Sequence, residues 1–278
     1  MSDRRALAGR IGLLAAAGFI CAWSVAPFAW FALASLKSPR ELAIVPPPIL
    51  PASFHADNFM RLGSRHRLWV PVTNSVIVAG STTIVAVPLA ALAAYALSRR
   101  GWRSRSALLA GILAVSMFPQ ITLAPTIVRW LYHLGWINTH AGLIVPYVSL
   151  TVPLAVWILA SFFREIPPEL EDAARIDGCG PVRTLRSVFL PVAAPAIATA
   201  AILTFIYAWN EFFFASIIVD AEAVRTLPVA IARFHGRYSL PWGEVSAASI
   251  VATLPLLVLV LALQRHIARG LTAGAVKG

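Results

Sequence analysis

Long apolar runs alternate with short polar segments along the chain. Six runs stand out, with edges uncertain by a few residues: 11–36, 72–98, 107–127, 141–163, 194–218 and 245–263. Each is near or above the ~20 residues with which a helix crosses about 30 Å of hydrocarbon. None alternates polar and apolar positions as the wall of a membrane barrel does, so the pattern predicts six transmembrane helices.

The composition agrees with a polytopic membrane protein. Of the 278 residues, 59% are hydrophobic and 13% are charged, whereas soluble domains have about 45–50% apolar and about 25% charged residues. The first run is too long for a cleavable signal peptide and no small-residue cleavage site follows it. We therefore expect an all-α fold with an N-terminal span and outer loop at 1–71, five core spans at 72–265 and a tail at 266–278.

The placement of basic residues predicts the orientation. An even number of spans places both termini on one side of the membrane. If that side is the cytoplasm, 14 of the 23 basic residues fall in the short inside segments, as the positive-inside bias requires. We therefore expect cytoplasmic termini, and anionic lipid explains the net charge of +11 without any nucleic-acid partner.

The polar segment between the fourth and fifth runs is a candidate docking element. Pro167 and Pro168 favour the start of a helix there. On a helical wheel its small apolar arc and its charged arc separate, and they consist of Leu170, Ala173, Ala174 and Ile176 on one side and Glu171, Asp172 and Arg175 on the other. A small apolar face permits close approach by another protein, while a solvated or lipid-surface loop is an equal alternative.

A sharp turn is predicted to end this helix. Gly178 suits a left-handed residue after the last helical turn, and Pro181 suits the first turn of a second short helix that reaches Phe189. Asp177 falls in the apolar arc, which suggests that its carboxylate accepts backbone N–H groups at the turn.

Polar residues within the spans are candidates for a translocation path. In the fifth run, Thr204, Tyr207 and Glu211 share one helical face, and Asn210 lies at its edge. An ionisable residue inside a span indicates a functional site, although a structural hydrogen bond or subunit contact is the favoured reading here. In the third run, Pro119 and Pro125 predict a bend that makes Gln120 a second candidate, with a simple packing kink as the alternative.

Several motifs in the order and spacing of one family resemble the membrane subunits of carbohydrate ABC importers, of the maltose-permease type. "EDAARIDG" and "FLP" resemble the EAA loop of this family, which places its Glu-Ala-Ala on Asp172, Ala173 and Ala174. "TNSVIVAGSTTIVAVPLAALAAYALSR", "LGWINTHAGLIVPY", "YAWNEFFF" and "GLTAGAVKG" resemble further family segments. Asp172 departs from the usual Glu, so the charge is kept while the side chain is one methylene shorter.

The resemblance implies a six-helix type I importer permease in the bacterial cytoplasmic (inner) membrane. The chain would form half of a pore with a sister permease subunit, and an extracytoplasmic sugar-binding protein would deliver substrate. Two ABC ATPase subunits would bind ATP and Mg and contact the ATPase-coupling residues Leu170, Glu171, Asp172, Ala173, Ala174, Asp177 and Gly178. The family's tail implies a further ATPase contact by Ala275, Val276, Lys277 and Gly278, with a frayed tail as the alternative. No G-x-x-x-x-G-K-[ST] motif occurs, so no cofactor is expected on this chain.

Two other classes fit the sequence less well. A proton-coupled secondary transporter normally carries several ionisable residues within its spans, and Glu211 is the only acidic residue in the six runs. A membrane enzyme is disfavoured by the absence of hydrolase and metalloprotease motifs, and the histidines show no metal-ligand spacing. The expected substrate is a di- or oligosaccharide, with glycerol phosphodiesters or polyols as the alternative.

Overall fold

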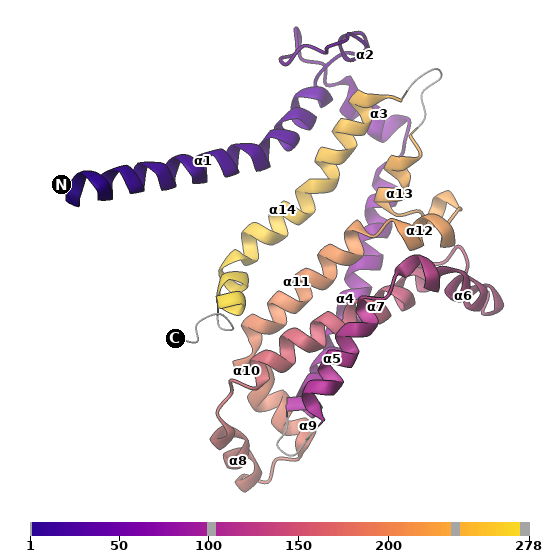
Figure 1. The fold of residues 1–278 in the computed structure, drawn as a ribbon. Helices are drawn as coiled ribbons and strands as arrows, with labels where there is room; N and C mark the ends of the chain where they lie inside the picture. Colours follow the sequence, from indigo (N-terminus) through magenta and orange to yellow (C-terminus); the bar gives the residue numbers. More distant parts are fainter. Residues whose placement is uncertain (1, 99–103, 235–239, 273–278) are drawn as a thin grey trace. The chain divides into compact units, whose positions relative to one another are not determined.

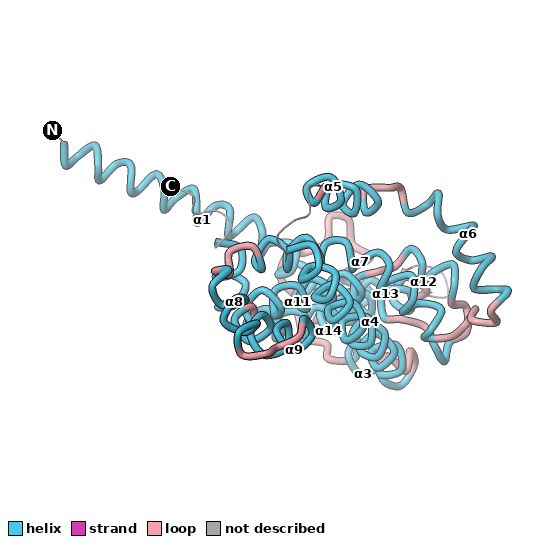
Figure 2. Tube along the Cα trace, turned by 90° about the horizontal axis from the view of Figure 1, so that it is seen from below, coloured by secondary structure: helices cyan, strands magenta, loops and turns pink. Residues whose placement is uncertain are grey.

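A computed structural model describes residues 2–98, 104–234 and 240–272, and within these ranges every regular element is a helix (Figures 1 and 2). The long helices are those that the apolar runs predict. In chain order the elements are α1 (Ser2–Ser35), α2 (Pro39–Leu42), α3 (Asp57–Ser64), α4 (Trp69–Ser98), α5 (Arg105–Ser116), α6 (Gln120–His133), α7 (His140–Phe163), α8 (Pro168–Ile176), α9 (Pro181–Thr184), the π-helical turn η1 (Leu185–Phe189), α10 (Leu190–Val192), α11 (Ala194–Asn210), α12 (Phe213–Ile218), the 3-10 turn η2 (Glu222–Val224), α13 (Leu227–Ala232) and α14 (Trp242–Thr272).

Four helices of the described chain are long and apolar enough to cross a membrane by themselves. They are the Gly9–Ser35 part of α1, α4, α7 and the Trp242–Ala262 part of α14. Two bent pairs bring the number to six if each pair is one span: α5 with α6, bent by 81°, and the helix Pro181–Val192 with α11, bent by 84°. The all-α polytopic fold is therefore confirmed.

Two predicted runs are interrupted rather than continuous. The third run breaks at Pro119, which precedes the first residue of α6 and has no N–H to continue the ladder of α5. The fifth run breaks at Glu211, where the backbone becomes extended (φ −65°, ψ 123°) before α12 begins. The bend at Pro119 follows the proline pattern, but apolarity does not reveal the break at Glu211.

The chain divides into two compact units. Unit 2 comprises Trp69–Ala230 and Pro255–Gly278. Its core lies where α4, α7 and α11 pack against one another, and alanine is the commonest residue in it, beside larger aliphatic and aromatic side chains. Alanine lets helix backbones approach closely inside a membrane. Within this unit α8 lies at one end of the bundle, and α6 and α12 lie at the opposite end (Figure 1).

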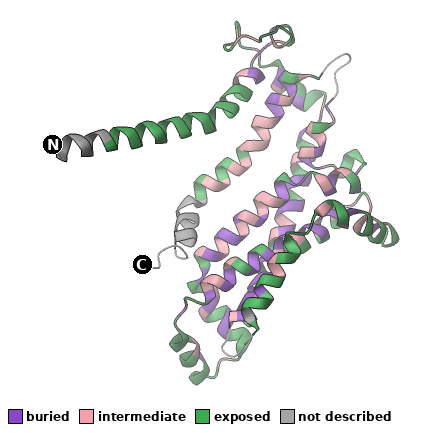
Figure 3. Ribbon diagram, in the orientation of Figure 1, coloured by how far each residue is buried: buried purple, intermediate pink, exposed green. Residues whose placement is uncertain are grey.

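The faces of the spanning helices differ in exposure (Figure 3). About half of the apolar window of α7 is buried (50%), whereas none of the window of α1 is (0%). Because the Gly9–Ser35 part of α1 is mostly apolar on all faces, its exposed side chains suit a lipid or protein environment rather than water.

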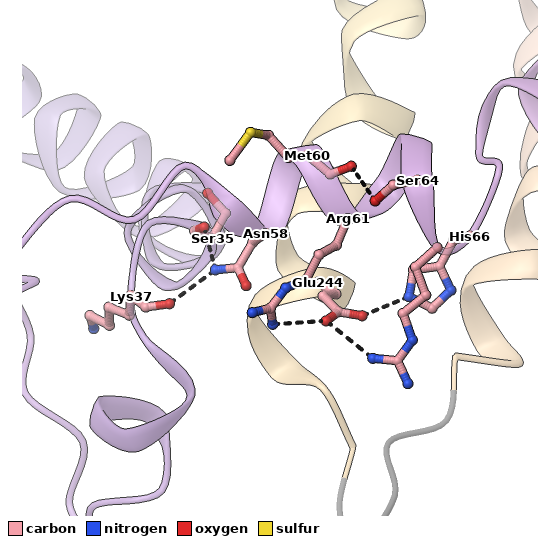
Figure 4. Close-up of polar contacts among 9 residues, drawn as sticks. Ser35, Lys37, Asn58, Met60, Arg61, Ser64, His66 and Glu244 are labelled. Atoms are coloured by element: carbon pink, nitrogen blue, oxygen red, sulfur yellow. Dashed lines mark hydrogen bonds and ion pairs between the residues drawn. The ribbon is translucent and has the colours of Figure 1, made fainter.

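Unit 1 comprises Met1–Leu68 and Ile231–Leu254. An ionic group around the buried Glu244 joins α3 and its C-terminal turn to the first turn of α14 (Figure 4). The Glu244 carboxylate, 3% exposed, pairs with Arg61 at 3.3 Å, Arg65 at 3.6 Å and His66 at 2.6 Å. The sixth apolar run begins at residue 245 and so excludes Glu244, but α14 begins three residues earlier, at Trp242. Glu211 is therefore not the only acidic residue in a candidate span.

Candidate functional site

The segment 164–191, which connects α7 to α11 and which we call the connecting segment, contains the predicted docking helix. α8 begins at Pro168, as the two prolines predict, with Glu169 and Glu171 in its first turn. Gly178 follows with φ +77°, a left-handed backbone that favours glycine. The N–H of Cys179 donates to the Ala174 carbonyl at 2.9 Å and closes this helix end. The predicted start and glycine stop are both confirmed.

One face of α8 is apolar and largely exposed. Of the predicted apolar arc, Ala174 is buried at 5% exposure, whereas Leu170 is 42% and Ile176 is 87% exposed, and Ala173 is exposed as well. On the other face, Arg175 pairs with Glu171 at 2.8 Å and with Asp172 at 3.7 Å. The helix therefore presents uncovered apolar side chains beside an acidic rim.

Asp177 does not act as the sequence suggests. Asp177 is exposed, and among the described residues no backbone N–H group donates a hydrogen bond to its carboxylate. The N–H of Asp177 itself donates to the Ala173 carbonyl at 3.0 Å. The interpretation of a carboxylate-capped turn is therefore wrong, because Gly178 and Cys179 close the helix through backbone bonds alone.

The second helix of the connecting segment is longer than predicted. It begins at Pro181, contains the π-helical turn η1, and continues through α10 to Val192. The N–H of Leu190 donates to the carbonyl of Leu185, five residues earlier. After Ala193 the chain turns by 84° into α11. Apolar spacing gives no sign of the π turn.

Glu211 is buried at the break between α11 and α12 and has several donors. Its carboxylate accepts a hydrogen bond from the Tyr147 hydroxyl and two from the backbone N–H groups of Phe214 (2.8 Å) and Ala215 (3.1 Å). It is 7% exposed. Because Glu211 follows the last residue of α11, it does not continue the helical face of Thr204 and Tyr207. It instead holds the first turn of α12 against α7.

The other candidate path residues have hydrogen-bond partners of their own. The Gln120 amide of α6 donates to the Tyr207 hydroxyl of α11 at 2.6 Å. Thr204, one turn before Tyr207, is buried, whereas Asn210 is exposed and donates to the Ile206 carbonyl at 2.8 Å. The structure thus pairs Gln120 with Tyr207 and Glu211 with Tyr147. Tyr147 is not among the predicted path residues, although a tyrosine inside an apolar run indicates that its hydroxyl group needs a polar partner.

A cavity of about 470 Å³ lies where α5, α6 and α7 meet, in unit 2. Its wall is mainly apolar and includes two indole rings, those of Trp130 and Trp136. Ser116, Thr126 and Ser149 also line it, and the hydroxyl groups of Ser116 and Ser149 donate to carbonyls of their own helices. Aromatic faces with a few hydroxyl groups suit a neutral polar solute that has an apolar face.

The described residues contain no group of three or more side chains able to hold a metal ion. The predicted tail contacts at Ala275, Val276, Lys277 and Gly278 lie outside the described residues.

Comparison with known proteins gives the family. Residues 86–273 match the profile of the binding-protein-dependent transport system inner membrane component. This chain belongs to that family. The fold with bent third and fifth spans is therefore that of an inner-membrane transport subunit.

Full-length relatives support the carbohydrate branch of the family. The permease is 40% identical to the trehalose/maltose transport system permease protein MalG of Thermococcus litoralis, over 91% of each chain. It is 38% identical to the sulfoquinovosyl glycerol transport system permease protein SmoH of Agrobacterium fabrum, over 91% of this chain and 88% of that one. The predicted resemblance to carbohydrate ABC importer permeases is confirmed, as is the prediction of a transport subunit rather than an enzyme.

A solved structure has the same fold. A chain of a bacterial ABC transporter that imports the acidic polysaccharide alginate superposes with a TM-score of 0.77 at 21% identity, covering 95% of the permease and 97% of that chain. At this identity the likeness concerns the fold alone.

Proposed function

We propose that the permease forms half of the translocation pore of an ATP-driven importer of a di- or oligosaccharide, and that α8 docks on the ATPase subunits. The observation that carries this proposal is the exposed apolar face of α8 in a membrane chain. Leu170 and Ile176 are 42% and 87% exposed beside the acidic side chains of Glu171 and Asp172. Uncovered apolar side chains with a polar rim are typical of a protein interface.

The orientation follows from this docking role. ATPases work in the cytoplasm, so the connecting segment and both termini would lie there, in agreement with the distribution of basic residues. α6 and α12, at the opposite end of unit 2, would then face outward, toward an extracytoplasmic binding protein. ATP and Mg would be held by the two ATPase subunits, and a sister permease would complete the pore.

Two features of unit 2 support a path for sugar. The Gln120–Tyr207 pair offers an amide and a hydroxyl group where a hydrogen bond connects α6 to α11. The cavity between α5, α6 and α7 adds two tryptophans and three residues with hydroxyl groups to its lining. Glu211 has its hydrogen bonds within the chain, so we assign it a structural role rather than a path-lining one.

The name of one relative favours a second substrate class. SmoH is named for sulfoquinovosyl glycerol, a glycerol-linked sugar. Glycerol-linked solutes are therefore the alternative to a di- or oligosaccharide for this permease. A binding screen of the cognate extracytoplasmic protein against disaccharides, oligosaccharides, polyols and glycerol phosphodiesters decides between them.

Charge reversal at Asp172 tests the docking role. Like charges placed opposite each other at a protein interface cost several kcal/mol, so Asp172→Lys should reduce sugar uptake and ATPase co-purification at least about tenfold. Membrane insertion should be unchanged. Glu222→Lys is the control for ATPase co-purification, because it reverses the charge of an exposed carboxylate in η2, outside the connecting segment. Uptake equal to wild type in Asp172→Lys would remove Asp172 from the coupling role.

The transport class has its own test. The purified permease, reconstituted alone in vesicles, should move no sugar when a proton gradient is imposed. Reconstitution with the ATPase subunits, the sister permease and the binding protein should give uptake that requires ATP. Uptake by the permease alone, driven by protons, would overturn the importer assignment.

A further inference from the structure

The ring of Phe189 lies where three helices of unit 2 end. It belongs to the π-helical turn η1, and its centroid is 4.8 Å from that of Tyr95 and 5.4 Å from that of Phe163, in edge-on geometry at 72° and 84°. All three rings are buried, with exposures of 4%, 6% and 2%. We call these three residues the aromatic trio.

The aromatic trio holds the two ends of the connecting segment together. Phe163 is the last residue of α7, immediately before the segment, and Phe189 lies near the end of it. Their ring contact therefore joins the two ends of a chain segment whose middle is α8. Tyr95 adds the last turn of α4 to the same contact. A displacement of α8 can reach α4 and α7 through these rings, because a packed interior transmits strain rather than absorbing it.

The π turn sets the direction in which Phe189 points. A π-helical turn carries one residue more than an α-helical turn, and such turns are rare and often found at functional sites. Its conversion to α-helix would rotate the flanking helix by about 100°, the angle per residue of an α-helix. Phe189 would then leave its place between Tyr95 and Phe163. The contact of Phe189 with Tyr95 and Phe163 therefore depends on the π-helical register of η1.

We propose that Phe189 is the positioning residue through which movement of α8 reaches α4 and α7. This inference rests on the proposed function, since it requires that ATPase subunits move α8. ATP-driven closure would act on α8, the strain would pass along the helix Pro181–Val192 to Phe189, and the trio would turn it into a rearrangement of the spans. Docking depends on α8, whereas transmission depends on Phe189.

This role makes a prediction that a merely structural role does not. A residue that only supports the fold lowers assembly, ATP hydrolysis and uptake together. A residue that transmits movement lowers uptake while the ATPases still dock and still hydrolyse ATP. The ratio of sugar transported to ATP hydrolysed is therefore the decisive quantity.

The experiment uses the complete transporter in proteoliposomes with its binding protein. Phe189→Leu and Phe189→Ala remove the ring in two steps, and Tyr95→Leu removes the other side of the contact. The control is Phe162→Leu, the same change beside Phe163, because Phe162 is half-buried and packs against the same core without belonging to the trio. Co-purification of the ATPases, ATP hydrolysis and uptake are measured for each variant.

Phe189→Leu and Tyr95→Leu should keep ATPase co-purification and hydrolysis within about twofold of wild type, and uptake should fall about tenfold, within the usual range of coupling between distant sites. Phe162→Leu should leave the ratio of transport to hydrolysis unchanged. Equal losses of uptake and hydrolysis in the trio variants, or an unchanged ratio, would overturn the inference.

If Phe189→Ala does not assemble, the two leucine variants decide. Failure of the proposed function would show separately, as a wild-type permease that neither binds ATPases nor transports with ATP.

Discussion

The hydroxyl of Tyr147 on α7 donates a hydrogen bond to the carboxylate of Glu211, at the break between α11 and α12. The same carboxylate accepts the N–H groups of Phe214 and Ala215. A buried carboxylate is costly unless donors surround it. The three donors explain how an acid is tolerated inside the fifth apolar run.

Removing this carboxylate should weaken the fold. Glu211→Ala leaves the Tyr147 hydroxyl and two backbone N–H groups without their acceptor, and each buried group left unpaired costs about 1–3 kcal/mol. We expect a loss of at least about 2 kcal/mol in the free energy of unfolding, measured by thermal unfolding in detergent. Asn210→Ala is the control, because Asn210 is exposed and donates within its own helix. Equal stability of the two variants would contradict the structural role of Glu211.

Gly178 should be required for its backbone conformation and not for its size. Its φ is +77°, and no atom lies within 4 Å of an added Cβ. Gly178→Ala should therefore cost about 1 kcal/mol through left-handed strain alone and should increase proteolysis of the connecting segment. Gly180→Ala meets equally open space at φ −70° and should be neutral. Equal proteolysis of the two variants would show that the turn does not depend on the left-handed residue.

Gly243 should be required for its size. A Cβ there would lie 2.7 Å from the Asn58 side chain, which is held by hydrogen bonds to the carbonyls of Ser35 (2.8 Å) and Lys37 (2.9 Å). Gly243→Ala should destabilise unit 1 by about 1–3 kcal/mol, as overpacking does. Gly63→Ala, in α3 with open space around it, should be neutral or stabilising by up to about 1 kcal/mol. Thermal unfolding compares them, and a neutral Gly243→Ala would argue against the close approach of α3 and α14.

The loop after α2 should change at acid pH. Hydrogen bonds from the N–H groups of Ser38 and Ala52 and from the Ser38 hydroxyl lower the pKa of Glu41 from 4.5 to about 2. A pKa that is lower in the folded state stabilises the fold fully above the unfolded value of 4.5, and this contribution is lost as the pH falls through about 2. Pepsin should cut segment 42–54 of Glu41→Gln faster than that of wild type at pH 4, and equally fast below pH 2. Equal cutting at pH 4 would refute the role of Glu41.

The candidate coupling helix could be predicted almost completely from sequence. Its start at Pro168 and its left-handed stop at Gly178 follow from chain-local chemistry, in which proline fixes φ and glycine tolerates a positive φ. The role of Asp177 could not be predicted, because whether a carboxylate meets a backbone N–H depends on how the turn closes. The spans could be located for a similar reason, since apolar length alone decides whether a helix fits a bilayer.

The sequence by itself determined the membrane class, the approximate spans and the helical connecting segment of this permease, because these depend on hydropathy, periodicity and backbone preference. Only the tertiary structure decided which polar groups meet. Tyr147 reaches Glu211 from another helix, and Phe189 enters the aromatic trio through a π turn that no local pattern signals. Such pairings depend on helix packing and register, which join residues far apart in the chain and leave no periodic mark in the sequence.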